Sequence, residues 1–350
     1  MKRNLTTAIE DAERSRLPWG YLLITFLALV LARNLLEGAL GPNGSIGFVH
    51  FSSPSALMVL DHFVFFYGSL YLSFALVLSV LTRERIGRVM RVVTPAWALL
   101  LIPPVLDYIL TGGEGMEITY VLELRPVVLR FFDPRVSFET ISPGQRVEIL
   151  GACLLAAAYV RLKTRSWARG VAGFIAIYLV LALHGVLPSL VARASWALTR
   201  AAAASAEFAY LTAFKSGGLV ADESRKLALV FFLTTVALGW LAFRRHSPEK
   251  ERAMRRNVRP LRSLHYIGMV AFGIAFGWVL FSRAGVEFAG AGDVLGILAT
   301  CLATLFAFQA SVAINDLFDE EGDRVSEGAR PLVSGALKRR DLVGQAVVFS

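Results

Sequence analysis

The sequence predicts an all-α integral membrane protein with about eight to nine transmembrane helices. Hydrophobic residues make up 55% of the 350 residues, and charged residues make up only 18%. The apolar residues are gathered into stretches of about 20, the length that a helix needs to cross the hydrocarbon core of a bilayer. This composition excludes a secreted disulfide module, a disordered chain and a soluble enzyme.

The expected spans follow one another along the chain and separate into two groups. The first span follows a mixed-charge stretch and has no small-residue cleavage site, so we expect it to be retained rather than removed as a signal peptide. Pro103 and Pro104 should kink the third span. A ninth apolar run opens at Leu342. In order, the expected spans cover 19–40, 60–82, 92–112, 147–163, 170–191, 226–243, 263–282 and 293–315.

The orientation follows from the basic residues, which give the chain a net charge of +9 and collect in alternate connections, at 83–91, 161–169 and 244–262. Basic loops stay in the cytoplasm. We therefore expect a multi-pass protein of a bacterial or archaeal cell membrane, with a cytoplasmic amino terminus. The same loops account for the charge excess, so nucleic acid is not an expected partner.

The connection at 244–262 is also the expected domain boundary, because it is the longest charged, proline-containing stretch between spans. We expect a six-span membrane domain of unknown role over residues 1–252 and a second bundle over residues 253–350.

An acidic segment after the eighth span carries the candidate chemistry. If the helix continues through it, Asp316, Asp319 and Asp323 share one face and Asn315 lies beside Asp319. Carboxylates stacked in this way repel one another unless a hard divalent cation lies between them. Mg²⁺ commonly shares its coordination sphere with substrate phosphates, so the pattern indicates a diphosphate held through Mg²⁺. The alternative interpretation is a solvated acidic loop.

The pattern Asn-Asp-x-x-Asp-x-x-x-Asp at 315–323, followed by Arg-Pro-Leu-Val-Ser-Gly at 330–335, resembles the first aspartate-rich motif and cytoplasmic loop of the UbiA-type intramembrane prenyltransferases. The resemblance covers about residues 253–350. It implies an all-helical bundle that transfers an isoprenyl group from a prenyl diphosphate to an acceptor, with Mg²⁺ bound between two aspartate-rich motifs.

Carried over to this chain, the resemblance implies that Asp316, Asp319 and Asp323 are the catalytic Mg²⁺ ligands and that Asn315 and Arg330 bind the substrate. The implied partners are a prenyl diphosphate, a lipophilic or aromatic acceptor and membrane lipid. The second motif of the family should follow several spans later. We therefore expect residues 253–350 to be the amino-terminal part of a longer catalytic domain.

Two other functions are compatible with the sequence. The chain is also interpretable as a multi-span transporter or carrier whose acidic residues bind a coupling cation, or as a non-catalytic membrane scaffold that retains half of a prenyltransferase site. The acceptor and the length of the prenyl chain are not indicated by any motif.

Several ionisable residues fall within the expected spans or at their ends, where charge is costly and commonly functional. The expected orientation brings them toward the outer face, where they suggest a second site. Arg33 and Glu37, four residues apart, can pair on one helix. His62 and His184 could instead ligate a metal or haem across two spans. The full group is Arg33, Glu37, Asp61, His62, Asp107 and His184.

Overall fold

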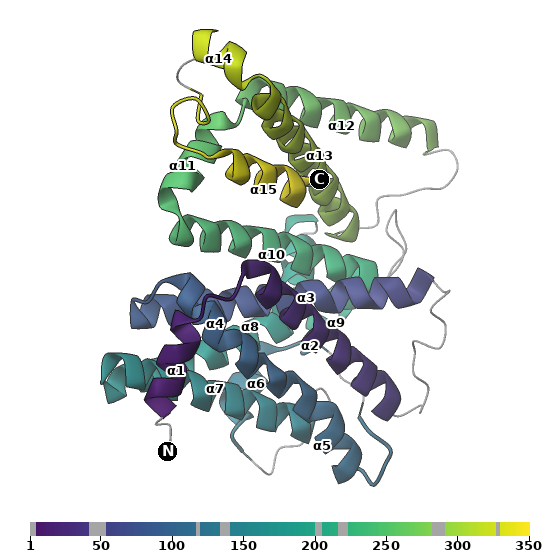
Figure 1. The fold of residues 1–350 in the computed structure, drawn as a ribbon. Helices are drawn as coiled ribbons and strands as arrows, with labels where there is room; N and C mark the ends of the chain where they lie inside the picture. The colour runs from purple at the N-terminus through teal and green to yellow at the C-terminus, as the bar shows by residue number, and fades with distance from the viewer. Residues whose placement is uncertain are drawn as a thin grey trace. The chain divides into compact units, whose positions relative to one another are not determined.

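The computed structural model describes residues 5–41, 54–116, 120–133, 141–199, 205–215, 223–281, 291–326 and 330–350. Over these residues the chain is helical and contains no strand, which confirms the predicted all-α, multi-span class. The helices divide into two compact units (Figure 1). Unit 1 comprises Met1–Ser216 with Asp222–Ala242, and unit 2 comprises Gly217–Ala221 with Phe243–Ser350.

Within the described residues, 7 helical stretches are long and apolar enough to cross a membrane. Their bounds agree closely with the corresponding apolar runs of the sequence. They are Trp19–Leu40, His62–Thr82, Ile86–Leu110, Trp167–Ala197, Glu223–His246, Pro260–Leu280 and Gly292–Phe318.

The expected span at 147–163 does not appear among these stretches. It lies in α7, Pro143–Thr164, which is as long as a span but is not among these apolar stretches. Arg146 and Glu148 near its start and Arg161 and Lys163 near its end leave only a short apolar centre. The run that opens at Leu342 forms part of α15, Arg339–Phe349.

Unit 1 is built on the packing of α7 against α8, with α5 also against α7 and α3 against α8. Its helices are α1 (Leu5–Arg14), α2 (Trp19–Leu40), α3 (Pro54–Thr82), α4 (Ile86–Ala96), η1 (Trp97–Leu101), α5 (Ile102–Leu110), α6 (Leu124–Arg130), α7, α8 (Trp167–Thr199), α9 (Ala206–Tyr210), η2 (Leu211–Lys215) and α10 (Glu223–His246).

The third span is interrupted at its prolines. Pro95 lies in the last turn of α4, the chain then tightens into the 3₁₀ turn η1, and Pro103 and Pro104 occupy the first turn of α5. Proline is tolerated there because first-turn N–H groups have no partner within the helix. The interruption buries Trp97, whose ring packs edge-on against Tyr71 with centroids 5.3 Å apart.

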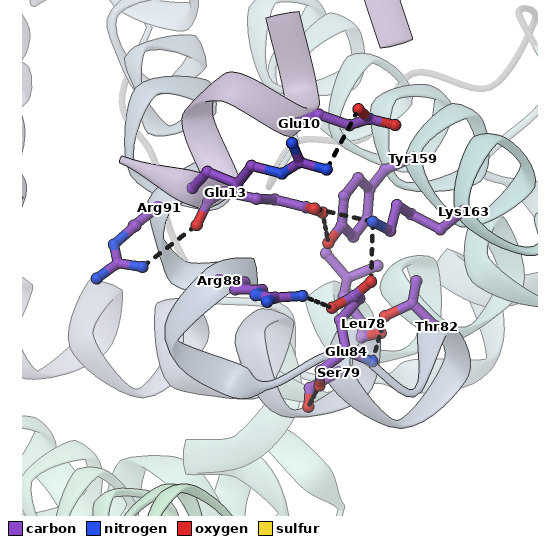
Figure 2. Close-up of polar contacts among 11 residues, drawn as sticks. Glu10, Glu13, Leu78, Ser79, Thr82, Glu84, Arg88, Arg91, Tyr159 and Lys163 are labelled. Atoms are coloured by element: carbon purple, nitrogen blue, oxygen red, sulfur yellow. Dashed lines mark hydrogen bonds and ion pairs between the residues drawn. The ribbon is translucent and has the colours of Figure 1, made fainter. Parts of the chain in front are cut away.

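One end of unit 1 is closed by an ion network that ties α1 to the bundle (Figure 2). The Glu13 side chain is only 4% exposed and accepts hydrogen bonds from the Lys163 ammonium and the Tyr159 hydroxyl, each at 2.8 Å. Arg91 donates to the main-chain carbonyl of Glu13 at 3.2 Å. The same Lys163 ammonium lies 2.8 Å from Glu84, so one cation lies between two carboxylates.

Glu84 holds the turn between α3 and α4. Its carboxylate pairs with Arg88 at 3.2 Å, and its main-chain carbonyl accepts from the Ser79 hydroxyl at 2.7 Å. The hydrogen bond from Lys163 is the main cause that lowers the pKa of Glu84 below its ordinary value. A carboxyl with a depressed pKa stabilises the folded state only while it is ionised.

Unit 2 consists of α11 (Pro248–Asn257), α12 (Pro260–Phe281), α13 (Ala291–Phe318), α14 (Glu320–Ser326) and α15. Both α12 and α15 pack against α13. A small core of Ala253, Ala313, Leu337 and Leu342 joins α11, α13, α15 and the segment leading into α15. Lys250 adds a 2.7 Å ion pair with Asp341 at the start of α15.

Replacing the bridging cation should weaken unit 1. Lys163→Gln leaves Glu13 as a buried carboxylate without its ammonium partner. We expect a loss of about 2 to 4 kcal/mol, somewhat less than the about 3 to 5 kcal/mol for a completely buried pair, because 19% of the Lys163 side chain is exposed. Thermal unfolding in nonionic detergent, followed by tryptophan fluorescence, measures the change.

The matched control is Arg169→Gln, which removes an exposed charge in the first turn of α8 and should leave the midpoint nearly unchanged. Glu84 adds a pH test with a defined sign. Its stabilising contribution should be complete above its ordinary pKa of 4.5 and should be lost as the pH falls below that value. Equal destabilisation by both variants, or an acid response that Lys163→Gln does not reduce, would contradict this role of Lys163.

Candidate functional site

The acidic motif lies at the end of α13, where the apolar residues of the span stop. The main chain keeps its helical path across the junction with α14, because the N–H of Asp319 donates to Asn315 and the N–H of Asp323 donates to Asp319, each at 2.9 Å. Asp316 and Asp323 are therefore two helical turns apart and point to the same side.

Asp316 is the centre of the site. Its side chain is 3% exposed and accepts hydrogen bonds from residues of two other segments. Oδ2 accepts from the Asn257 amide at 2.7 Å, and Oδ1 accepts from Arg259 and Arg330, each at 3.1 Å. Asn257 ends α11 and Arg259 immediately precedes α12, so the junction between these helices supplies two of the donors.

Arg330 joins the two ends of the motif. Its Nη1 donates to Asp323 Oδ2 at 2.6 Å as well as to Asp316 Oδ1. Asp323 is also buried, with 7% of its surface exposed. The segment that follows the motif therefore folds back over it and neutralises part of its charge.

The other acidic residues of the motif face different partners. Asp319 accepts from the Asn315 amide at 2.6 Å, as its predicted position suggested, and both residues are exposed. Glu320 accepts from Arg324 at 2.8 Å and from Arg339 at 2.6 Å, and these two hydrogen bonds lower its pKa. The motif thus has a buried part, Asp316 with Asp323, and an exposed part.

The donor chemistry at the buried part is compatible with Mg²⁺, which prefers carboxylate oxygens. Oxygens of Asp316 and Asp323 lie within hydrogen-bond distance of one nitrogen, so a single cationic group already occupies the position between them. No group of three or more His, Cys, Asp or Glu side chains is close enough to hold a metal among the residues that the structure describes. Mg²⁺ binding therefore remains a prediction.

Two buried polar atoms extend the site along the spans. Gln309 lies two turns before Asp316 on α13, and Ser263 lies one turn after Arg259 on α12. Gln309 Nε2 and Ser263 Oγ have no hydrogen-bond partner among the described residues. Beyond the polar contacts of Asp316, these two side chains are therefore isolated polar groups on otherwise apolar helices.

The structure brings together Asp316, Asp323 and Arg330, which the sequence analysis named, and adds Asn257 and Arg259, which it did not name. The available signal was the basic character of 244–262, which indicated a cytoplasmic loop without distinguishing one arginine from another. Arg259 differs from its neighbours by its position directly before the Pro260 that begins α12.

Comparisons of the chain with protein families, curated proteins and solved structures gave no match.

The bridge made by Arg330 should be measurable as an energetic coupling. Arg330→Gln and Asp323→Asn each remove one partner, and the double variant removes both. We expect the single changes to destabilise unit 2 by more, in sum, than the double variant does, with a coupling free energy of about 1 to 3 kcal/mol. Thermal or denaturant unfolding of the four proteins gives the cycle. Strictly additive effects would show that the two side chains do not interact.

Proposed function

We propose that the segment from about residue 253 onward belongs to a membrane prenyltransferase, which transfers an isoprenyl group from a prenyl diphosphate to a lipophilic or aromatic acceptor. The observation that carries the proposal is the pair of hydrogen bonds from Arg330 to Asp316 and Asp323. They bring the acidic motif and the Arg-Pro-Leu-Val-Ser-Gly segment into one polar site at the end of an apolar span, which is the arrangement that a lipid diphosphate requires.

The arginines suit the leaving group of this reaction. Prenyl transfer breaks a carbon–oxygen bond of the donor, and negative charge grows on the departing diphosphate. A guanidinium group binds phosphate oxygens strongly and can donate two parallel hydrogen bonds to them. Arg259 and Arg330 both reach Asp316 Oδ1, so they are already gathered where the diphosphate would bind. Fixed positive groups at that place stabilise the developing charge.

The carboxylates suit the accompanying cation. Asp316 and Asp323 would hold Mg²⁺, with Asp319 nearby on the motif. When bound, Mg²⁺ would neutralise charge on the diphosphate. The amide of Asn257 holds Asp316 Oδ2, which leaves Oδ1, on the side of the arginines, as the oxygen that would bind the metal. Asn257 thus acts as a positioning residue for the carboxylate.

The spans suit the lipid part of the donor. A prenyl chain is excluded from water and would lie along α12 and α13 on the membrane side of Asp316, past Ser263 and Gln309. The basic connections support a cytoplasmic location for the diphosphate end. Unit 1 precedes the proposed catalytic segment and contributes no residue to this part of the proposal.

The test is Mg²⁺-dependent binding of a prenyl diphosphate. Farnesyl diphosphate, titrated calorimetrically into the detergent-solubilised full chain, should bind in the presence of Mg²⁺ and not with EDTA. Asp316→Asn removes the central carboxylate and should weaken binding by about tenfold or more, comparable to the loss of a metal-site residue.

Glu321→Gln is the matched control, because it removes an exposed acid of the same segment and should leave binding unchanged. Tryptophan fluorescence checks that both variants remain folded. Binding that persists in EDTA, or that Asp316→Asn and Glu321→Gln affect equally, would exclude this site as the diphosphate site. Absence of binding to the unaltered chain would contradict the proposal directly.

A further inference from the structure

Unit 1 encloses a cavity of about 180 Å³ that the proposed transferase does not use. Its walls come from α2, α3, α7, α8 and the segment around α6, and most of them are aromatic or aliphatic. One side is polar and carries Arg33, Glu37, Gln145 and Glu148. A cavity of this size holds several water molecules or a small organic group.

Arg33 is the cation of this polar side. Its side chain is 1% exposed, and Nη1 donates to Glu37 at 2.8 Å, one turn along α2. The Tyr67 hydroxyl also lies near the guanidinium. The Nε–H of Arg33 has no partner in the described part of the chain, although it is buried. A buried donor without an acceptor is costly and marks a place for an acceptor atom.

Glu148 supplies a second carboxylate from α7. It lines the same cavity and is attracted by the nearby Arg33 guanidinium. Its position is well defined, because the start of α7 is pressed against α5. Gly144, one turn earlier, lies so close to α5 that an added Cβ would be 2.6 Å from the Pro103 carbonyl oxygen. Only glycine permits this approach.

Asp107 is the remaining acidic residue of this region, but it does not line the cavity. Its carboxylate accepts from the Ser142 hydroxyl and, at 2.7 Å, from the N–H of Gly144, so it caps α7. Charges at the cavity are therefore one guanidinium against the carboxylates of Glu37 and Glu148. Arg33 pairs with Glu37 and also attracts Glu148, so one positive charge faces two carboxylates and the cavity keeps an excess of negative charge.

Aromatic rings in the cavity wall also favour a positively charged ligand. Phe63, Phe66, Tyr67, Tyr120 and Tyr178 all line the cavity, and ring faces attract organic cations. His62 makes its hydrogen bond with the Tyr120 hydroxyl and not with a carboxylate of the cavity.

We infer that this cavity binds an organic ammonium compound that carries an oxygen atom two carbons away from its charged nitrogen. The ammonium donates to the Glu148 carboxylate, and the neighbouring oxygen accepts from the free Nε–H of Arg33. The apolar part of the ligand lies against Phe131, Tyr178 and Leu181. The amino-alcohol headgroup of a lipid and a free amino alcohol share this chemistry. The inference concerns unit 1 alone and does not depend on the proposed transferase.

The test compares two compounds that differ at one position. In 2-butoxyethanol, an ether oxygen replaces the charged nitrogen of 2-(butylamino)ethanol. The amine should raise the unfolding temperature of the detergent-solubilised full chain, and the ether should not. Glu148→Gln should weaken amine binding by about tenfold or more, because it neutralises one partner of a desolvated charge pair. Glu114→Gln, at an exposed position of the same unit, is the matched control.

A second variant keeps the test decisive if Glu148→Gln does not fold. Ala182→Leu adds bulk to the cavity wall without touching a charge and should also abolish the shift. Equal shifts with both compounds, or a shift that survives in Glu148→Gln, would overturn the inference.

Nanodiscs identify the source of the ligand. A smaller amine shift in phosphatidylethanolamine than in phosphatidylglycerol discs would assign the site to a lipid headgroup. An equal shift in both would assign it to a free amine.

Discussion

Charge buried between helices has to be matched by an opposite charge or by hydrogen bonds, and this constraint accounts for the main polar contacts of both units. In unit 1, Lys163 lies between the carboxylates of Glu13 and Glu84 and ties the amino-terminal helix to the bundle. In unit 2, Arg330 lies between Asp316 and Asp323 and ties a loop to the end of a span. One cation between two carboxylates is thus the recurring solution.

The two candidate sites differ in how completely their buried polar groups are partnered. Asp316 is fully partnered, with both carboxylate oxygens engaged, so the site is organised before any ligand arrives. Preorganised polar groups stabilise a developing charge most effectively, which favours a chemical role there. The cavity of unit 1 instead leaves one guanidinium facing two carboxylates, and the Nε–H of Arg33 has no partner among the described residues. Incomplete matching favours a binding role.

Much of this organisation was predictable from local pattern. Apolar runs predicted the spans, because length and hydropathy decide whether a helix can cross a bilayer. Helical spacing predicted the contact of Asn315 with Asp319, and the short distance in sequence between the motif and Arg330 made their proximity a reasonable expectation. Charged ends shortened the apolar part of α7, which the count of expected spans overlooked.

Contacts between distant segments were not predictable. The partnership of Asn257 with Asp316 spans 59 positions and depends on how α11 packs near α13. Asp107 was grouped with the outer ionisable residues, but it caps α7 because its carboxylate reaches the N–H of Gly144. The position of Glu148 near Arg33 was likewise not predictable, because the close approach of α7 to α5 is visible only in three dimensions. Asp61, another residue of that group, has a side chain outside the described residues.

The most direct test of the central claim replaces Mg²⁺ with Mn²⁺ and records the electron paramagnetic resonance spectrum of the full chain with a prenyl diphosphate. If Asp316 and Asp323 form a metal–diphosphate site, protein-bound Mn²⁺ should show coupling to the phosphorus nuclei, and Asp316→Asn should abolish it. A spectrum of free Mn²⁺ with the unaltered chain, or phosphorus coupling to protein-bound Mn²⁺ that survives in Asp316→Asn, would contradict the account.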